Sequence, residues 1–563
     1  MSSRQQLPVL ILKDGTQETK DKDAQKSNVN TAKLVAQIVR TSLGPRGMDK
    51  MLVSPIGDVT VTNDGATILK EIDVEHPAAK MMVEISKATD NEVGDGTTST
   101  VVLAGSLLEK AETLLDKNVH STVIVEGFKS AAEKSIRVLR DQAAIKIDPE
   151  DRNMLHKIAQ TSLGSKMVSV NSKVLADIVV QAVLNIAEKN GEGLRVDTEN
   201  IKVEKKAGGS LADTRMIQGI VLDKEVVHSG MPRRIDDANI ALINSALEIE
   251  KPEFDAKINV SSPDQMQRFL DEESKILRSM VDRISSTGAN VLLCSKGIDD
   301  IAQHYMTKAG ILAVRRIKES DMTKLSKATG AKIVTNVDEL TSNDLGHAQL
   351  VEERKVENDK WVFIERCKNP KAVSILVRGG SERVVDEAER SIHDAIMSVR
   401  DAVEYPYIVV GGGAPEAIAS NKIREWAGSL SGRAQLAAEA FADGLETIPL
   451  VLAENAGMDP IDTQVQLRAK TSAVSKNGKA RYGVDVIGTK IADLATKDIY
   501  EPLAVKEQVI NSAVEAACMI LRIDNVIAAS KTKDNTPMPP GGEGGMGPYG
   551  GGMGGGDMSD MDM

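Results

Sequence analysis

The sequence contains few aromatic residues, which make up only 2% of its 563 residues. We therefore expect cores built mainly from Val, Ile, Leu, Ala and Met, because too few large rings are present to fill them. Cysteine is also scarce: Cys294, Cys367 and Cys518 lie far apart and form no Cys-x-x-Cys pair. This excludes a disulfide framework and a cysteine-based zinc site, and it indicates buried thiols in a reducing compartment.

Long apolar runs and an excess of positive charge are missing as well. No apolar run approaches the roughly 20 residues that a membrane-spanning helix needs, and residues 1–8 lack the apolar segment of a signal peptide. The net charge of −12 argues against nucleic acid as the main partner, because proteins that bind nucleic acid present a basic face. We therefore expect a soluble, cytoplasmic protein.

Several common enzyme signatures are absent. The sequence has no His-Glu-x-x-His and no Gly-x-Ser-x-Gly motif. A Gly-x-Gly-x-x-Gly match at 542–547 lies in a Gly- and Met-rich tail that cannot fold from about Lys531 onward. Residues 483–490 resemble a Walker A loop, but their Thr and Lys stand in reversed order. A Rossmann dinucleotide site and a P-loop are therefore excluded.

The length and the hydrophobic pattern predict several domains. A chain of 563 residues is too long for one core and suggests about two to four domains. Residues up to 148 have a mostly helical pattern, 149–215 change from helices to strands, and 216–371 alternate short β-type runs with helices. The pattern is helical again from 372 onward. We expect a multidomain protein in which the two terminal helical segments form one discontinuous domain around an inserted α/β module.

The most informative motif is Val93-Gly-Asp-Gly-Thr-Thr-Ser-Thr100, which precedes an apolar helical run. Glycine on both sides of Asp95 allows the backbone to approach a ligand closely. Residues 97–100 then begin a helix, whose free N–H groups would point into the same space. These donors, the hydroxyls and the carboxylate together suit a phosphate that carries Mg²⁺. The alternative is an Asp-Gly turn that only caps a helix.

Four other glycine-containing segments could line the same pocket, and each has an ordinary structural explanation. Residues 41–47 could be the C-terminal cap of a helix, and 62–67 could be a hairpin turn. Residues 409–414 could be a flexible joint, and 482–485 could be a simple turn. None of these segments identifies a nucleotide site by itself.

Nucleotide hydrolysis without a P-loop would give these segments a common role. It needs a carboxylate that holds the metal, backbone N–H groups around the phosphates, and a second carboxylate that orients water. Asp95 suits the first role, and Asp64 and Asp394 are candidates for the second. Asp394 lies on an amphipathic helical segment rich in charge, so its alternative is a solvent-exposed carboxylate.

Together these segments resemble the group II chaperonins, the family of the archaeal thermosome and its eukaryotic cytosolic relatives. The matching segments cover the chain from about residue 20 to 528 in the family's order: they are 41–52, 63–68, 93–99, 219–225, 230–232, 377–380, 389–395, 411–414 and 520–524. The resemblance implies an ATP-dependent molecular chaperone and ATPase. It would be a subunit of a double ring that encloses and folds non-native proteins, with lid closure driven by ATP hydrolysis. Its partners would be unfolded proteins and copies of itself or of related subunits, without nucleic acid or membrane.

The resemblance also implies three domains and a tail. A mostly α equatorial ATP-binding domain would comprise 1–148 and 404–528, and a small α/β intermediate domain 149–215 and 372–403. The remaining parts would be an α/β apical substrate-binding domain with a helical lid protrusion, and a disordered tail: 216–371, with the protrusion at about 252–285, and 529–563.

The resemblance assigns ATP and Mg²⁺ as cofactors and gives roles to individual residues. Asp95 would hold Mg²⁺, while Asp64 and Asp394 would position the attacking water. Lys166 resembles the lysine that senses the γ-phosphate, and Glu501 resembles the ribose contact. The other residues that would contact the phosphates or the ribose are Leu43, Gly44, Pro45, Gly96, Thr97, Thr98, Ser99 and Gly412.

The segment that would form the lid has its own sequence features. Residues 262–265 have the features of a helix start, with a Ser cap followed by Pro. Apolar residues follow at helical spacing, namely Met266, Phe269, Leu270, Leu277, Met280 and Val281. The alternative to a lid is an ordinary core helix that follows a long loop.

Two other functions stay open beside the chaperonin ATPase. One is a structural subunit that completes a ring but hydrolyses ATP slowly or not at all. The other is an ATP-dependent kinase or ligase of metabolism, although no small-molecule pocket can be recognised in the central segment. The presence of Asp64, Asp95 and Asp394 together favours the ATPase.

Overall fold

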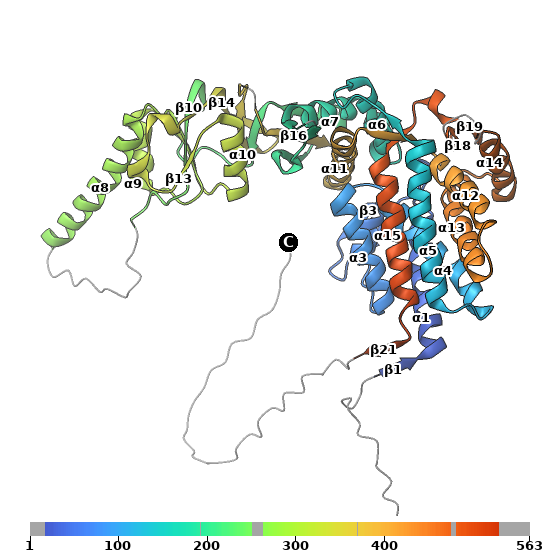
Figure 1. Ribbon diagram of the computed structural model, residues 1–563. Coiled ribbons are helices and arrows are strands. Elements are labelled where there is room, and N and C mark those ends of the chain that lie inside the picture. Colours follow the sequence, from blue (N-terminus) through green and yellow to red (C-terminus); the bar gives the residue numbers. More distant parts are fainter. Residues whose placement is uncertain (1–16, 192, 250–262, 369, 475–479, 529–563) are drawn as a thin grey trace, which may run out of the picture.

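A computed structural model describes residues 17–191, 193–249, 263–368, 370–474 and 480–528 of the chain. The molecule has three parts that follow one another (Figure 1), and each has a large apolar core. We refer to the parts around them as the helical bundle, the connecting block and the seven-stranded block. The chain leaves the bundle, passes through the connecting block to the seven-stranded block, and returns by the same route.

The helical bundle is built from both ends of the chain, because its core contains residues of 29–144 and of 409–521. Its long central helix α4 packs against α1, α13 and α15. Phe128 and Phe441 contact each other in this core, with ring centroids 5.9 Å apart. The helices are α1 (Asp21–Arg40), α2 (Gly65–Glu71), α3 (Pro77–Val93), α4 (Thr97–Asp116), α5 (Ser121–Val138), α12 (Ala414–Ala427), α13 (Arg433–Asn455), α14 (Pro460–Val474) and α15 (Leu503–Leu521).

Small sheets join distant parts of the bundle. The first and last described strands pair antiparallel at one end of the molecule, and a three-stranded sheet in the order β20–β17–β4 aligns Val409 with Glu501. The strands are β1 (Gln17–Lys20), β2 (Lys50–Val53), β3 (Val59–Thr62), β4 (Ile145–Lys146), β17 (Tyr407–Val410), β18 (Tyr482–Asp485), β19 (Lys490–Asp493), β20 (Tyr500–Pro502) and β21 (Asn525–Ala528).

The connecting block packs three helices around a three-stranded sheet of order β7–β16–β8. Its core also combines two segments of the chain, residues of 155–201 and of 373–408. The elements are α6 (Arg152–Gly164), α7 (Ser172–Ile186), β5 (Glu188–Asn190), β6 (Gly193–Arg195), β7 (Ile201–Ala207), β8 (Arg215–Ile217), β16 (Val373–Gly379) and α11 (Glu382–Glu404).

Contrary to the prediction from the sequence, one segment of the connecting block is long and apolar enough to cross a membrane by length and composition alone. This segment is Met167–Ile186, which includes α7. Its apolar residues Leu175, Val179 and Val183 are fully buried in the core, where α7 packs against α6 and α11. The packing therefore explains its hydrophobicity as that of a core helix.

The seven-stranded block forms one mixed sheet with helices beside it. The strand order is β12–β11–β10–β14–β15–β9, with β13 paired to β10. Ion pairs join the block to the connecting block: Lys202 Nζ lies 3.0 Å from Asp321 Oδ2, and Lys327 Nζ lies 3.2 Å from Asp197 Oδ2. The elements are β9 (Gly219–Leu222), β10 (Arg234–Ile243), α8 (Pro263–Ser286), β11 (Val291–Cys294), α9 (Asp300–Ala309), β12 (Leu312–Val314), α10 (Glu319–Thr329), β13 (Ile333–Val334), β14 (Gly346–Val356) and β15 (Asp359–Glu365).

The structure confirms several predictions made from the sequence. The short β-type runs of the central segment form strands, and all three cysteines are buried and free. The helix expected near 262 begins at Pro263 among the described residues. The tail from Lys531 and the rest of the expected protrusion before Pro263, from about 252, lie outside the described residues.

Candidate nucleotide site

The loop around Asp95 requires glycine on both sides. Gly94 ends α3 with φ 66° and Gly96 begins α4 with φ 78°, both in the left-handed region. A Cβ on Gly94 would overlap the side chain of Met397 on α11, and a Cβ on Gly96 would lie 2.8 Å from Val509 Cγ2 on α15. The loop is therefore held between two helices, and only glycine fits there without strain.

Three contacts fix the carboxylate of Asp95. Its Oδ1 accepts the Gly96 N–H at 2.6 Å, and its Oδ2 accepts the hydroxyl of Ser162 on α6 at 3.0 Å. The hydroxyl of Ser398 on α11 lies 3.5 Å from the same Oδ2. Residues from the bundle and from the connecting block thus orient one carboxylate.

The first turn of α4 presents donors beside this carboxylate. No side chain caps the helix N-terminus, since the N-cap residue is Gly96. Thr97, Thr98 and Ser99 are nevertheless buried, with exposures of 4%, 8% and 9%. Uncapped N–H groups at a helix N-terminus form a site for an anion such as phosphate.

Asp64 is the N-cap of α2, so the hairpin-turn alternative for 62–67 is wrong. Its Oδ2 accepts the Thr67 N–H at 2.7 Å, and its Oδ1 accepts the Thr97 hydroxyl at 2.9 Å. Burial favours the neutral acid, but the charge of Lys166 and the hydrogen bonds from Thr67 and Thr97 outweigh it and lower the pKa of Asp64. The group is therefore ionised at neutral pH.

Asp394 is buried, which overturns the alternative of a solvent-exposed carboxylate on α11. Its exposure is 6%, and it forms an ion pair with the ammonium of Lys166, which is 9% exposed. The side chain of Asn63 donates to the Ser165 carbonyl at 2.7 Å and ties this segment to the turn before α2. Lys166 thus pairs with Asp394, and its charge also acts on Asp64, which lies far from Asp394 in the sequence.

Helix α13 brings two of the predicted glycine loops together. A Cβ on Gly44 would overlap Leu452 of α13, and a Cβ on Gly413 would lie 2.6 Å from Pro449 Cβ, one turn earlier on the same helix. Asn455 donates to the Leu43 carbonyl at 2.9 Å. The segments at Leu43–Pro45 and 411–413 therefore lie on one stretch of α13.

Glu501 lies beside the second of these loops. A Cβ on Gly411 would be 2.5 Å from Glu501 Oε1, and Glu501 Oε2 lies 2.6 Å from Lys506 Nζ. The Val484 N–H donates to the Gly412 carbonyl at 2.9 Å. Burial raises the pKa of Glu501 despite the ammonium of Lys506.

Sequence reasoning missed several polar residues of this region. Ser162 and Ser398 hold Asp95, and Lys506 holds Glu501. Asp90 on α3 is a further carboxylate near the site, and burial and then the charges of Asp64 and Asp95 raise its pKa to about 6. Its place near the end of α3, just before the glycine loop, is the one sequence signal that could have found it.

The donor set suits a metal that arrives with a nucleotide. Within the described parts of the chain, no group of three or more His, Cys, Asp or Glu side chains is placed to hold a metal ion. Mg²⁺ is often bound through one or two carboxylates together with phosphate oxygens and water. A fixed Asp95 beside an uncapped helix N-terminus fits that chemistry.

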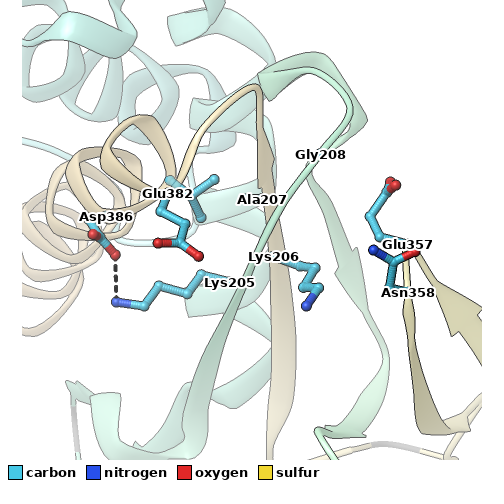
Figure 2. Close-up of a pocket in the computed structure, with 9 residues that line it drawn as sticks. Lys205, Lys206, Ala207, Gly208, Glu357, Asn358, Glu382 and Asp386 are labelled. Atoms are coloured by element: carbon cyan, nitrogen blue, oxygen red, sulfur yellow. Dashed lines mark ion pairs between the residues drawn. The ribbon is translucent and has the colours of Figure 1, made fainter. Parts of the chain in front are cut away.

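A separate cleft of about 590 Å³ lies away from these motifs, between β7, α11 and the β14–β15 turn (Figure 2). Lys205 points toward Asp386, 2.8 Å away. Arg378 and Glu357 form another ion pair at its edge, where Arg378 also donates to the Gly208 carbonyl. Its two lysines, Lys205 and Lys206, are already paired with carboxylates, so the cleft is a poor match for a nucleotide phosphate.

Comparison with known proteins decides the family. Residues 35–531 match the model of the TCP-1/cpn60 chaperonin family. The chain belongs to this family. It is 56% identical to thermosome subunit alpha of Archaeoglobus fulgidus over 94% of the chain and 96% of the relative. It is 54% identical to thermosome subunit beta of Thermococcus kodakarensis over 96% of the chain and 98% of the relative.

Family membership confirms the interpretation drawn from the motifs. The chain is a group II chaperonin subunit, and the predicted ATP-dependent chaperone function and ATPase activity are confirmed. The alternative of an ATP-dependent kinase or ligase of metabolism is not supported. The α-rich, multi-sheet structure agrees with a chaperonin fold.

Proposed function

We propose that ATP hydrolysis at the junction of the helical bundle and the connecting block drives closure of a lid around a non-native protein. The observation that carries this proposal is the buried ion pair between Lys166 and Asp394, whose ammonium also acts on Asp64. Lys166 and Asp394 belong to the connecting block, while Asp64 belongs to the bundle. A change in nucleotide charge at this junction would therefore act on both parts at once.

In this proposal each carboxylate has one role. Asp95 would hold Mg²⁺, since Ser162 and the Gly96 N–H fix its orientation. Mg²⁺, when bound, would neutralise phosphate charge and polarise the γ-phosphate. Asp64 and Asp394 would orient the attacking water, and the lowered pKa of Asp64 keeps it able to accept a hydrogen bond.

The remaining predicted residues would bind the rest of ATP. The uncapped turn at Gly96–Ser99 would receive phosphate oxygens, and Leu43, Gly44, Pro45 and Gly412 would line the site along α13. Glu501 would accept hydrogen bonds from the ribose hydroxyls. Lys166 would sense the γ-phosphate, because an ammonium already paired with Asp394 can share its charge with an added phosphate.

We also propose the division into equatorial, intermediate and apical domains with the boundaries given above. The three apolar cores support it, because two of them combine chain segments from before and after the seven-stranded block. Subunits of this kind would assemble with themselves or with related subunits into a double ring in the cytoplasm.

The lid proposal rests on the first turns of α8. Met266, Phe269 and Leu270 are 51%, 44% and 46% exposed in the single chain. Farther along the helix, Leu277 and Val281 are buried in the core of the seven-stranded block. One helix thus combines an anchored half with an exposed apolar half, as expected for a surface that meets unfolded chains or neighbouring subunits.

The sequence also allowed a ring subunit that hydrolyses ATP slowly or not at all, and membership of an ATPase family speaks against it. All three carboxylates to which we assign a role in hydrolysis are present, which favours the active enzyme. Steady release of phosphate from ATP and Mg²⁺ by the purified assembly, without an acceptor, is the deciding test. ATP binding without turnover would support the structural subunit instead.

A further inference from the structure

Lys506 is a buried cation that joins two carboxylates from different parts of the bundle. Its ammonium lies 2.6 Å from Glu501 Oε2 and 3.0 Å from Glu416 Oε1. Lys506 is on the first turn of α15, Glu416 is on the first turn of α12, and Glu501 is on β20. Lys506 and Glu416 are 7% and 4% exposed.

Burying these three charged groups costs free energy, so we expect their arrangement to serve a function. Burying charged groups carries a desolvation penalty that the mutual attraction often only balances. Burial opposes the charge of Lys506, but the carboxylates of Glu416 and Glu501 outweigh it and raise its pKa, so the lysine stays protonated. The second oxygen of Glu416 is buried and has no hydrogen-bond partner. Within the described parts of the chain, Lys506 is therefore the partner that the Glu416 carboxylate contacts.

The lysine decides which oxygen of Glu501 faces the glycine loop. Oε2 is occupied by the ammonium, whereas Oε1 lies against Gly411, where any Cβ would come within 2.5 Å of it. Val505, next to Lys506 on α15, would be 3.1 Å from a Cβ on Gly96. Helix α15 thus places the support of Glu501 and the wall of the Asp95 loop on the same turn.

We infer that Lys506, held in place by Glu416, is a positioning residue that presents Oε1 of Glu501 to the ribose hydroxyls of the nucleotide. The inference rests on the ribose role of Glu501 in the proposed function. Neither Lys506 nor Glu416 needs to touch the nucleotide. The consequence is selectivity for a nucleotide with sugar hydroxyls, because a carboxylate fixed for a hydroxyl group loses its partner when that hydroxyl is missing.

The test compares the affinities for ATP and for 2′,3′-dideoxy-ATP, which lacks both hydroxyls, in the full assembly. The wild type should bind ATP about tenfold more tightly or better, as expected for hydrogen bonds to a charged group. Lys506→Met should bring this ratio close to one while the affinity for the dideoxy nucleotide stays unchanged. Glu416→Gln, which keeps the shape of the side chain, should lower the ratio in the same direction and serves if the lysine variant does not fold.

A matched control removes another lysine that pairs with one carboxylate. Lys33 Nζ lies 2.7 Å from Glu112 Oε2, and Lys33→Met should keep the ratio of the wild type. Equal losses for both nucleotides in Lys506→Met and Glu416→Gln, or an unchanged ratio, would overturn the positioning role. A wild type that binds both nucleotides equally would instead refute the ribose role of Glu501, and the inference would fall with it.

Discussion

The Gly96 N–H donates to Oδ1 of Asp95, and the Ser162 hydroxyl donates to Oδ2. A glycine also precedes and follows Asp95 in the sequence. These contacts fix the position of the carboxylate. We expect Asp95→Ala to abolish Mg²⁺-dependent binding of ATP, since the substitution removes the carboxylate that we propose as the ligand of the metal. Calorimetric titration with ATP, with and without Mg²⁺, measures this. Asp116→Ala, at the other end of α4 on an exposed surface, is the control. Retained Mg²⁺-dependent affinity in Asp95→Ala would remove Asp95 from the site.

Asp401 gives a prediction about pH. It is 5% exposed, and burial raises its pKa to about 7 despite the neighbouring Arg400. The usual carboxyl pKa near 3.9 applies in the unfolded chain, so between about pH 4 and 7 the folded state holds the extra proton. The free energy of unfolding should therefore fall as the pH rises through this window.

Asp401→Asn should remove most of this pH dependence. We expect the variant to exceed the wild type in stability by roughly 3 kcal/mol more at pH 8 than at pH 5, because the folded wild type holds its extra proton over about two pH units in this interval. Urea unfolding at both pH values measures the difference. An identical difference between the two proteins at pH 5 and pH 8 would show that Asp401 is ionised in the fold at both.

Single residues also show where sequence reasoning reached its limit. The glycines around Asp95 predict that the backbone can approach a ligand closely, and their left-handed conformations agree with this prediction. Asp394 and Lys506 carry no such signal, because each lies on a helix where a charged residue ordinarily faces solvent. Their burial depends on partners from distant segments, Lys166 and Glu416, which one sequence cannot place.

At the level of elements, the N-terminus of α4 depends on its contact with α15. Gly96→Ala adds strain at φ 78° and places a Cβ 2.8 Å from Val509. We expect a loss of about 1–3 kcal/mol of stability from overpacking in addition to the strain, and weaker ATP binding because the first turn shifts. Denaturant unfolding and nucleotide titration measure the two effects.

The variant Gly310→Ala measures the cost of the left-handed backbone conformation without any overpacking. Gly310 ends α9 with φ 71°, and no atom lies within 4 Å of the position that a Cβ would take. This variant should lose only the cost of the left-handed conformation, about 1 kcal/mol, and should bind ATP normally. Equal losses in Gly96→Ala and Gly310→Ala would contradict the proposed contact between α4 and α15.

Some elements were predictable and others were not. Short apolar runs such as Val291–Cys294 form buried strands as expected, because nothing else suits such a run between helices. The long hairpin β14–β15 was missed, since β14 contains several charged residues with low strand propensity. Its strands also bury apolar residues such as Val351 and Val362 in the core, and Arg354 binds Glu365 across the strands through two hydrogen bonds of 2.7 Å.

At the level of the whole molecule, α8 is far from α4 and α11, which carry residues of the proposed nucleotide site (Figure 1). Replacing Phe254 to about Asp271 by a short Gly-Ser linker should therefore leave ATP hydrolysis unchanged. It should prevent closure, because the exposed side chains that would be buried, each worth about 1.5–3 kcal/mol, are gone. Protease access to a trapped substrate in the presence of ATP measures closure.

If the shortened assembly still protects its substrate from protease, α8 is only part of the core of the seven-stranded block. A matched replacement of the exposed loop at 54–58 by the same kind of linker should leave closure intact, since this loop lies on the bundle. The discontinuous organisation itself was visible in the sequence, because helical segments at both ends enclose an α/β segment.

The central claim is that one catalytic site combines Asp64 of the bundle with Asp394 of the connecting block. The most direct test is a single-turnover measurement of ATP hydrolysis by Asp394→Ala, together with its affinity for ATP. We expect nearly normal affinity and hydrolysis slowed by about 10²-fold or more, as for the loss of a group that orients or activates water. Hydrolysis at the wild-type rate would contradict the account and would leave Asp394 as only the structural partner of Lys166.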